Sequence, residues 1–366
     1  MEKILTTLLI FSLFTGFLAF LLTLAKKTIG NYGIMKVTIN EETEIEMEGG
    51  DTLLSGLTEE KIFIPSACGG KGSCGYCKVT VESGGGEILP TEFGYVTPEE
   101  RELGVRLSCQ LKVKEPIAIS IPEELFNVKE FHPTVTAITD LTPNIKHLIF
   151  TFPQGEEISF KAGQYVQLRA PKYPGNHEEV FRAYSIASSP TEHNKLELII
   201  GLVPDGICST YVHKHLSVGD EVAMTGPYGD FYYQESTREI LMVAAGTGMA
   251  PILSILHQLK AMNSERRAIF YFGARHEEDL FFLERMKEFE SDLISFEFIP
   301  SLSKPHRETD WKGQLGRVTT CLQRDLMDPC EREAYLCGSP RMIDSIVEVL
   351  IEKGIPEEFI YYDKFS

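Results

Sequence analysis

The sequence predicts a multidomain chain that combines α+β and α/β folds behind an N-terminal helix. Three observations support this fold class. Residues 4–25 carry no charge, short β-rich runs with Gly and Pro between them fill residues 129–235, and strands alternate with helices from residue 238 onward. A chain of 366 residues is long enough for several domains, so each of these parts can bury a core of its own.

The uncharged stretch at residues 4–25 is rich in Leu, Phe and Ile. At about 1.5 Å per residue, a helix of that length reaches about 33 Å, which is enough to cross a bilayer core. A cleaved signal peptide is the alternative, but its apolar region normally has about 7 to 15 residues. The sequence therefore favours a single-pass transmembrane helix. Lys3 precedes this helix and Lys26 and Lys27 follow it, so the positive-inside rule says little about which end faces the cytoplasm.

Four cysteines form the most specific motif of the chain. Cys68, Cys74 and Cys77 lie within ten residues and are separated by glycines, and Cys109 follows after 31 further residues. This spacing supplies the four thiolates of a [2Fe–2S] cluster and resembles the plant-type ferredoxin loop with one residue inserted. Zinc is a weaker alternative because zinc ribbons usually carry two Cys-x2-Cys knuckles and this chain has one. Disulfides and buried free cysteines are the remaining alternatives.

The region around these thiols, residues 34–126, is predicted to form a β-grasp, ferredoxin-like domain. The predicted strands are residues 35–40, 41–48 and 78–82, and the predicted helices begin near Asp51 and Thr97. Residues 41–60 hold eight acids and no base, which indicates either a solvated face or a docking surface for an electron-transfer partner. The formal charge of −18 argues against nucleic acid and anionic lipid headgroups as partners, because both would repel the chain.

Residues 129–235 are predicted to form a small antiparallel barrel, with strands near residues 134–138, 147–152, 165–169 and 196–203. Within it, the run Arg182-Ala-Tyr184-Ser185 resembles the flavin motif of the ferredoxin–NADP reductase superfamily. The resemblance implies an FAD site in which Arg182 pairs with a flavin phosphate, Tyr184 stacks on or bonds the flavin and its ribityl chain, and Ser185 reaches flavin N5.

Two further runs extend this resemblance. Gly206, Ser209 and Thr210 are similar to the second flavin motif, which places backbone N–H and hydroxyl groups on the pyrophosphate at a helix start. The run Gly226-Pro-Tyr-Gly229 resembles the turn that closes the barrel. Each motif alone is weak, but their order and spacing make coincidence a poor explanation.

Residues 238–366 are predicted to form a parallel α/β domain with its ligand at the carboxyl edge of the sheet. The predicted strands are residues 239–245, 268–273 and 295–300, and the predicted helices are residues 251–263 and 280–290. The first strand runs into Gly246-Thr247-Gly248 and a helix with Pro251 in its first turn. Such a turn lets the backbone and a helix N-terminus approach a pyrophosphate, and it resembles the nicotinamide-nucleotide turn of the superfamily.

The resemblance also implies roles for residues near the C-terminus. It puts Cys337, followed by Gly338, beside the nicotinamide, with a core cysteine as the alternative. It makes Phe365 the aromatic residue that covers the flavin ring until nicotinamide displaces it, with a terminal core position as the alternative. The acids of residues 277–279 would repel the 2′-phosphate of NADP, so NADH is preferred, although Arg275 leaves NADPH open.

The order of these parts resembles the family of the F subunit of the sodium-translocating NADH:quinone oxidoreductase over essentially the whole chain. The resemblance implies electron transfer from NADH through FAD and the [2Fe–2S] cluster to integral membrane subunits of a complex, with quinone as the final acceptor. It implies a helix in the inner membrane and soluble domains in the cytoplasm, and it leaves sodium transport to other subunits. In one departure, the segment between Gln164 and Arg182 is shorter than the usual insertion of the family.

Two other functions stay open at this point. The reductase component of an oxygenase has the same order of domains, usually without a membrane helix. A membrane redox sensor would bind the same cofactors and signal rather than turn over.

Overall fold

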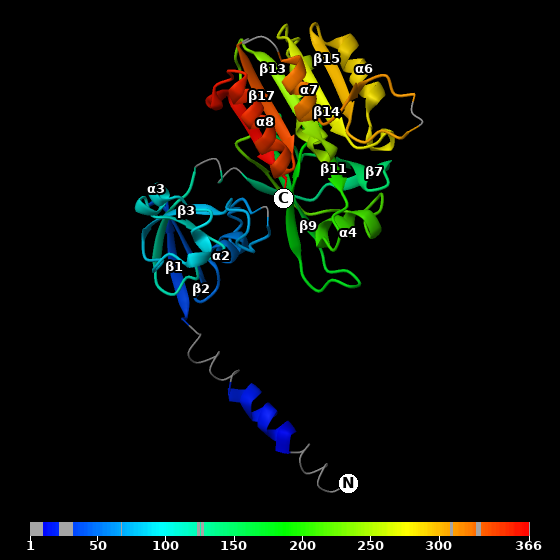
Figure 1. Ribbon diagram of the computed structural model, residues 1–366. Coiled ribbons are helices and arrows are strands. Elements are labelled where there is room, and N and C mark those ends of the chain that lie inside the picture. The colour runs from blue at the N-terminus through cyan, green and yellow to red at the C-terminus, as the bar shows by residue number, and fades with distance from the viewer. Residues whose placement is uncertain are drawn as a thin grey trace, which may run out of the picture. The chain divides into compact units, whose positions relative to one another are not determined.

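The structure is a computed structural model that describes residues 10–21, 32–66, 68–122, 125, 128–307, 310–326 and 331–365. The chain divides into two compact units, residues 1–128 and residues 129–366 (Figure 1). The predicted division of the second unit, between residues 235 and 238, stays a prediction.

Residues 10–21 are helical and exposed, and they fall inside the predicted transmembrane helix at residues 4–25. Within the described ranges, no helix combines the length and the apolar character needed to cross a membrane. The ends of the predicted helix, residues 4–9 and 22–25, lie outside the described residues.

A five-stranded mixed sheet forms the rest of the first unit, in the order β2-β1-β5-β3-β4. Strands β1 and β5 are parallel, and the other neighbours are antiparallel. Its strands and helices are β1 (Ile34–Ile39), β2 (Thr43–Glu48), α2 (Leu53–Glu59), β3 (Lys78–Ser83), α3 (Pro98–Glu102), β4 (Val105–Leu107) and β5 (Ile117–Ser120). Helix α2 begins after Thr52, one residue later than predicted, because the Thr52 hydroxyl accepts a hydrogen bond from Ser55 N–H at 3.2 Å.

The first half of the second unit has two antiparallel sheets, in the orders β10-β9-β12-β6 and β11-β8-β7. The strands are β6 (Lys129–Phe131), β7 (Thr134–Thr142), β8 (Ile145–Thr151), β9 (Tyr165–Ala170), β10 (Val180–Ser185), β11 (Lys195–Gly201) and β12 (Met224–Tyr228). Isolated bridges from Ile186 to Leu198 and from Thr134 to Glu221 join the sheets. The two linked sheets enclose one apolar core, and their closure into the predicted single barrel stays a prediction.

One predicted turn in this half is wrong. The run from Gly226 to Gly229 does not close the sheet, because Gly226 to Tyr228 belong to strand β12. The pairing of β12 with β9 shifts its register between Thr225 and Tyr228, so an irregular strand replaces the turn.

The second half of the second unit is a six-stranded parallel sheet, in the order β16-β15-β14-β13-β17-β18 (Figure 1). The strands are β13 (Glu239–Ala245), β14 (Ala268–Ala274), β15 (Phe296–Leu302), β16 (Gln314–Leu315), β17 (Arg332–Gly338) and β18 (Ile360–Lys364). The helices are α5 (Met249–Ala261), α6 (Leu283–Asp292), α7 (Val318–Asp325) and α8 (Pro340–Glu352). The predicted parallel α/β arrangement is confirmed.

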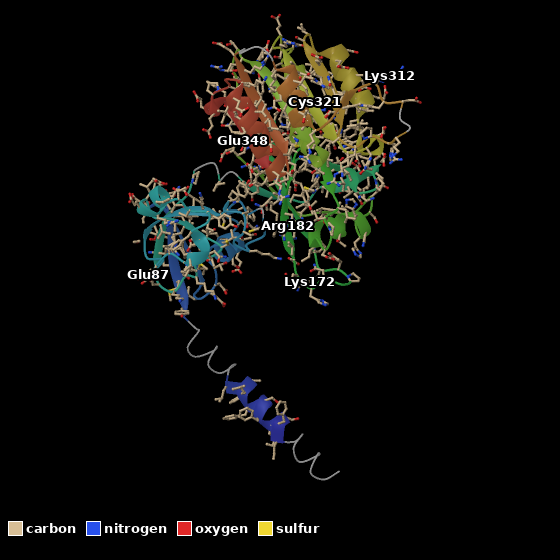
Figure 2. All side chains as sticks on the ribbon, in the orientation of Figure 1. Glu87, Lys172, Arg182, Lys312, Cys321 and Glu348 are labelled. Carbon is tan, nitrogen blue, oxygen red and sulfur yellow. The ribbon has the colours of Figure 1, made fainter. Side chains whose placement is uncertain are left out.

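Helices cover both faces of this sheet. Helices α5 and α6 pack on the face that includes Met242 and Phe270. Helices α7 and α8 pack on the face that includes Val243 and Tyr271, where Cys321 of α7 is fully buried (Figure 2). Burial on both faces explains why the central strands β13 and β14 are nearly continuous apolar runs.

Candidate cofactor sites

The four cysteines of the sequence motif come together in the first unit as two contacting pairs. Cys77 Sγ and Cys109 Sγ are 3.2 Å apart and buried, while Cys68 and Cys74 are hydrogen-bonded to each other and partly exposed. The hydrogen bond from Cys74 lowers the pKa of Cys68 to about 4, and the one from Cys77 lowers the pKa of Cys109 to about 7. The partners that donate these hydrogen bonds, Cys74 and Cys77, have raised pKa values for the same reason. Each pair therefore holds one thiol that ionises readily to the thiolate, the form that binds metal.

The backbone around the thiols fits a metal cluster. Backbone N–H groups of Lys71 and Ser73 donate to Cys68 Sγ, and that of Gly72 donates to Cys109 Sγ. Gly70 and Gly72 have φ of 81° and 71°, values that residues with a Cβ rarely adopt. Four sulfur ligands with several N–H donors aimed at them fit a [2Fe–2S] cluster, whose sulfurs accept such hydrogen bonds.

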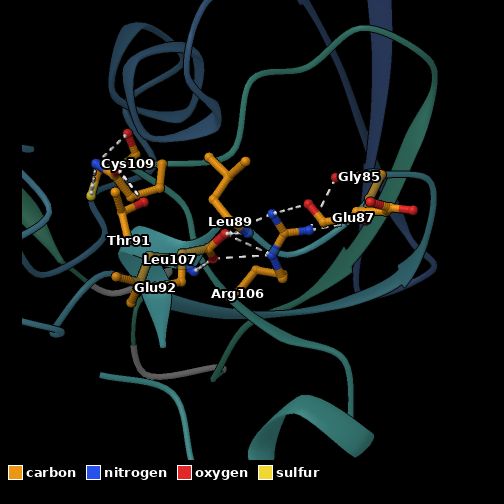
Figure 3. A network of polar contacts seen from close by, with 10 residues as sticks. Gly85, Glu87, Leu89, Thr91, Glu92, Arg106, Leu107 and Cys109 are labelled. Atoms are coloured by element: carbon orange, nitrogen blue, oxygen red, sulfur yellow. Dashed lines mark hydrogen bonds and ion pairs between the residues drawn. The ribbon is translucent and has the colours of Figure 1, made fainter. Parts of the chain in front are cut away.

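A buried ion pair supports the segment that carries Cys109 (Figure 3). The Arg106 guanidinium donates to the Glu92 carboxylate at 2.7 to 3.1 Å, and Glu92 is fully buried. The same carboxylate accepts the backbone N–H groups of Leu89 and Leu107, both at 2.9 Å. Sequence reasoning missed this pair, because nothing in the spacing of its two residues marks them as partners.

Arg182 and Tyr184 of the first flavin motif lie two residues apart on strand β10. Arg182 is labelled in Figure 2. Arg182 Nη1 donates to the Phe181 carbonyl at 2.7 Å. Tyr184 is hydrogen-bonded to Cys208 of helix α4 (Ile207–Lys214), and burial raises the pKa of Tyr184 well above its ordinary value. The structure thus brings the two flavin motifs into contact, through Tyr184 and Cys208.

The second flavin motif begins helix α4, with Gly206 as its N-cap and Thr210 in its first turns. The Ser209 hydroxyl accepts from Val203 N–H at 3.1 Å and bonds the Gly206 carbonyl at 3.2 Å, so its proton has acceptors within the loop. Ser188 Oγ, just after β10, and Gln167 Nε2, on β9, are buried and have no hydrogen-bond partner among the described residues. Such atoms fit a site whose polar ligand supplies the partner.

The predicted nucleotide turn lies at the carboxyl end of β13. Gly246 to Gly248 form a single 3₁₀ turn that leads into α5, where Pro251 is the third residue. A Cβ on Gly248 would overlap the Cys337 carbonyl, so this turn packs against β17 only with glycine. Gly246 has φ of 57° and nothing within 4 Å of a Cβ position, which leaves room above the turn for a ligand.

Strand β18 brings a residue to this edge that sequence reasoning missed. Asp363 pairs with Cys337 across the ladder of β17 and β18 and is hydrogen-bonded to the Ser185 hydroxyl. Burial raises the pKa of Asp363 to about 6, and the Ser185 hydrogen bond opposes the rise. Ser185, Asp363 and Cys337 therefore form one polar cluster at the carboxyl edge of the sheet. Cys337 itself is fully buried.

Phe365 follows directly on this cluster. Its backbone N–H donates to the Gly338 carbonyl at 2.9 Å, and its ring is partly buried against the core that includes Cys337. A C-terminal aromatic side chain is thus fixed beside β17.

A second buried carboxylate joins the two halves of the second unit. Glu197 of β11 accepts hydrogen bonds from His147 at 2.9 Å, Lys195 at 2.7 Å and Arg285 of α6 at 3.1 Å. Arg285 also contacts His257 of α5 at 2.6 Å. Glu197 therefore ties the antiparallel sheets to the helices that cover the parallel sheet.

Three family models match the chain in the order in which the sites occur. They are a 2Fe-2S iron-sulfur cluster binding domain over residues 37–114, an oxidoreductase FAD-binding domain over residues 132–233 and an oxidoreductase NAD-binding domain over residues 242–348. The predicted cofactors, a [2Fe–2S] cluster, FAD and NADH, are thereby confirmed, and the zinc and disulfide alternatives fall away.

Full-length relatives extend the match beyond single domains. The chain is 35% identical to the F subunit of the Na(+)-translocating NADH-quinone reductase of Neisseria meningitidis, with all of both chains covered. It belongs to this family. The F subunit of the Haemophilus ducreyi enzyme is 34% identical, with 95% of both chains covered. The family shows that the chain is an oxidoreductase that transfers electrons from NADH through FAD to a [2Fe–2S] cluster.

Solved structures share the fold. A cytochrome P450 reductase of Amycolatopsis, GcoB, has a TM-score of 0.73 and 26% identity, over 90% of this chain and 98% of that one. The ferredoxin reductase in carbazole 1,9a-dioxygenase has a TM-score of 0.70 and 23% identity, over 91% of this chain and 99% of that one. Because the carbazole dioxygenase reductase is only 23% identical to this chain, its likeness shows a shared fold and nothing more.

Proposed function

We propose that the chain is the electron-input subunit of a sodium-translocating NADH:quinone reductase. The observation that carries the proposal is full-length identity of 35% to an F subunit of such an enzyme, across all three cofactor domains. In this proposal electrons leave the chain for integral membrane subunits of the complex, and quinone is the final acceptor.

The same proposal includes a membrane anchor at residues 4–25, in the inner membrane, with the soluble domains in the cytoplasm. The support is the uncharged sequence of that stretch, which is long enough for a helix of about 33 Å. Tethering would raise the effective concentration of the electron donor near an acceptor in the membrane.

The cofactors divide the chemistry. When bound, FAD takes two electrons with a hydride from NADH and passes them on singly to the cluster. Cys68, Cys74, Cys77 and Cys109 hold the cluster through four thiolates, and the N–H groups of the loop stabilise the charge on the sulfurs.

Residues of the second unit hold and orient the other two cofactors. The sequence motif assigns Arg182 to a flavin phosphate and Tyr184 to the flavin, with Gly206, Ser209 and Thr210 near the pyrophosphate. Because the Ser209 hydroxyl has partners in its own loop, the role of Ser209 is to shape that loop so that its backbone meets the ligand.

The nucleotide site is assigned to the carboxyl edge of the parallel sheet. Gly246, Thr247 and Gly248 form the turn that leads into α5, and Pro251 lies in the first turn of that helix, where N–H groups and the helix dipole favour a pyrophosphate. Ser185 and Cys337 are assigned to the hydride-transfer position. The support is Asp363, which is hydrogen-bonded to Ser185 and pairs with Cys337 at this edge of the sheet.

Phe365 is assigned as the side chain that covers the flavin and yields to nicotinamide. Its support is the hydrogen bond that fixes its backbone to Gly338, next to Cys337.

A complementation experiment tests the proposal. Membranes from a strain without the chain should regain Na⁺-stimulated NADH:quinone reduction with the full-length chain and not with a chain that lacks residues 4–25. Restoration by the shortened chain would contradict the anchor. A purified chain that supports an oxygenase but gives no quinone reduction in membranes would favour the second candidate, an oxygenase reductase, to which the likeness to a cytochrome P450 reductase points.

A further inference from the structure

Three potential metal ligands outside the cysteine and flavin sites lie together in the second unit. They are His276 and Glu278, in the loop after β14, and His306, in the segment after β15. One ligand atom from each lies within 4.8 Å of the other two. His306 Nε2 is 3.0 Å from a Glu278 carboxylate oxygen, and the rings of His276 and His306 stack with centroids 5.0 Å apart.

Backbone hydrogen bonds hold the two segments against each other. Ser303 N–H donates to the Ala274 carbonyl at 3.0 Å, and Lys304 N–H donates to the Arg275 carbonyl at 2.8 Å. His276 N–H donates to the Asp279 carboxylate at 3.0 Å, which fixes the start of the short 3₁₀ turn at residues 277–279. The three side chains are therefore presented by a backbone that needs no further ordering.

One ring nitrogen in the group lacks a partner. His276 Nδ1 is buried and has no hydrogen-bond partner among the described residues, although buried polar atoms normally have one. Glu278 and His306, in contrast, are more than half exposed, so their side chains can rotate and water can reach the site.

The donor set decides which ligand fits. Two imidazoles and one carboxylate are the ligands that Zn²⁺ and related divalent transition metals prefer, whereas Mg²⁺ and Ca²⁺ prefer oxygen alone. Two donors that are each about 2.1 Å from a tetrahedral ion lie about 3.4 Å apart. The 3.0 Å separation of His306 and Glu278 is close to this value. The three ligand atoms lie within 4.8 Å of one another, and rotation of the exposed Glu278 and His306 side chains can bring them closer to the partly buried His276.

We propose that His276, Glu278 and His306 form a binding site for a divalent transition-metal ion such as Zn²⁺. The ion ties the loop after β14 to the segment after β15. Both segments follow the carboxyl ends of their strands, so the site belongs to the edge of the sheet at which the nucleotide domain binds its ligand. Water completes the coordination on the exposed side.

Calorimetric titration with Zn²⁺ of the full-length protein, with its [2Fe–2S] cluster intact by visible absorbance, tests the proposal. One site should be present in the wild type. His306→Ala and Glu278→Gln should each weaken its affinity on the order of tenfold or more, because even indirect partners of metal ligands contribute that much. Both residues are exposed, so these variants keep the fold. His177→Ala, which changes another exposed histidine, is the matched control and should bind as the wild type does.

Two results would overturn the site. The first is the absence of Zn²⁺ binding to the wild type. The second is equal binding to the wild type, His306→Ala and Glu278→Gln, which would assign the ion to other groups, such as cysteines that have lost the cluster.

Discussion

The buried ion pair between Arg106 and Glu92 should govern the stability of the sheet region next to the cluster. In Arg106→Met the Glu92 carboxylate keeps two backbone N–H donors but loses every contact with the guanidinium, while its side chain stays inaccessible to water. Removing one partner of a buried pair costs about 3 to 5 kcal/mol, because the other charge is left uncompensated. Local opening of strands β3 and β4 should become more than about 100-fold more frequent.

Native-state hydrogen exchange of the holo-protein measures this opening directly. Peptides that contain residues 78–83 and 105–107 should exchange faster in Arg106→Met by the factor given above. Lys78→Met is the matched control, since Lys78 and Glu100 form an ion pair in the same unit that is about one-third exposed. Loss of such a pair costs less than about 1 kcal/mol. If Arg106→Met changed the exchange no more than Lys78→Met, the reasoning about buried charge would be refuted.

The stability that the pair of Arg106 and Glu92 provides should also depend on pH. Burial raises the pKa of Glu92, but hydrogen bonds from Arg106 and from two backbone N–H groups outweigh burial, and the resulting pKa lies below the ordinary value. A carboxylate with a depressed pKa stabilises the fold above its unfolded pKa of about 4.3, and this stability is lost as pH falls through the folded pKa. Local opening, measured as exchange relative to the intrinsic chemical rate at each pH, should therefore become more frequent in acid in the wild type and change less in Glu92→Gln.

Three further predictions concern the electron path. Cys109→Ser should abolish the low-temperature EPR signal of the reduced cluster and keep NADH:ferricyanide activity; unchanged quinone reduction would exclude the cluster from the path. In the wild type, the rate of flavin reduction by NADH should rise near pH 6, because the Asp363 carboxyl ionises there and its charge favours the forming nicotinamide cation. Asp363→Asn should remove this inflection. An inflection that persists in Asp363→Asn would assign the titration to another group. Glu197→Gln should destabilise the second unit by about 3 kcal/mol in thermal unfolding, with Glu284→Gln, from an exposed pair, as a control that should change little.

Local patterns predicted much of the fold. Strand β13 ends at Ala245 as predicted. Its run is apolar because the strand is buried between β14 and β17. The capping box of Thr97 and Glu100 starts α3 in the structure as it does in the sequence. These features depend on residues a few positions apart, which is the range that a sequence pattern covers.

Long-range partners were outside that range. Asp363 contacts Ser185, and Glu197 contacts Arg285, through pairings that only the folded sheets create. The order of the antiparallel strands in their two sheets was also outside that range, since strand spacing does not determine which strands pair. The four cysteines were predicted together because the chemistry of one cluster, rather than the fold, requires them.

Anaerobic titration of the reconstituted protein with NADH, followed by visible absorbance and low-temperature EPR, tests the central claim most directly. Electron transfer through FAD to the cluster predicts loss of the oxidised flavin absorbance together with the signal of a reduced [2Fe–2S] cluster. Flavin reduction without that signal would contradict the claim that the cluster accepts electrons from the flavin.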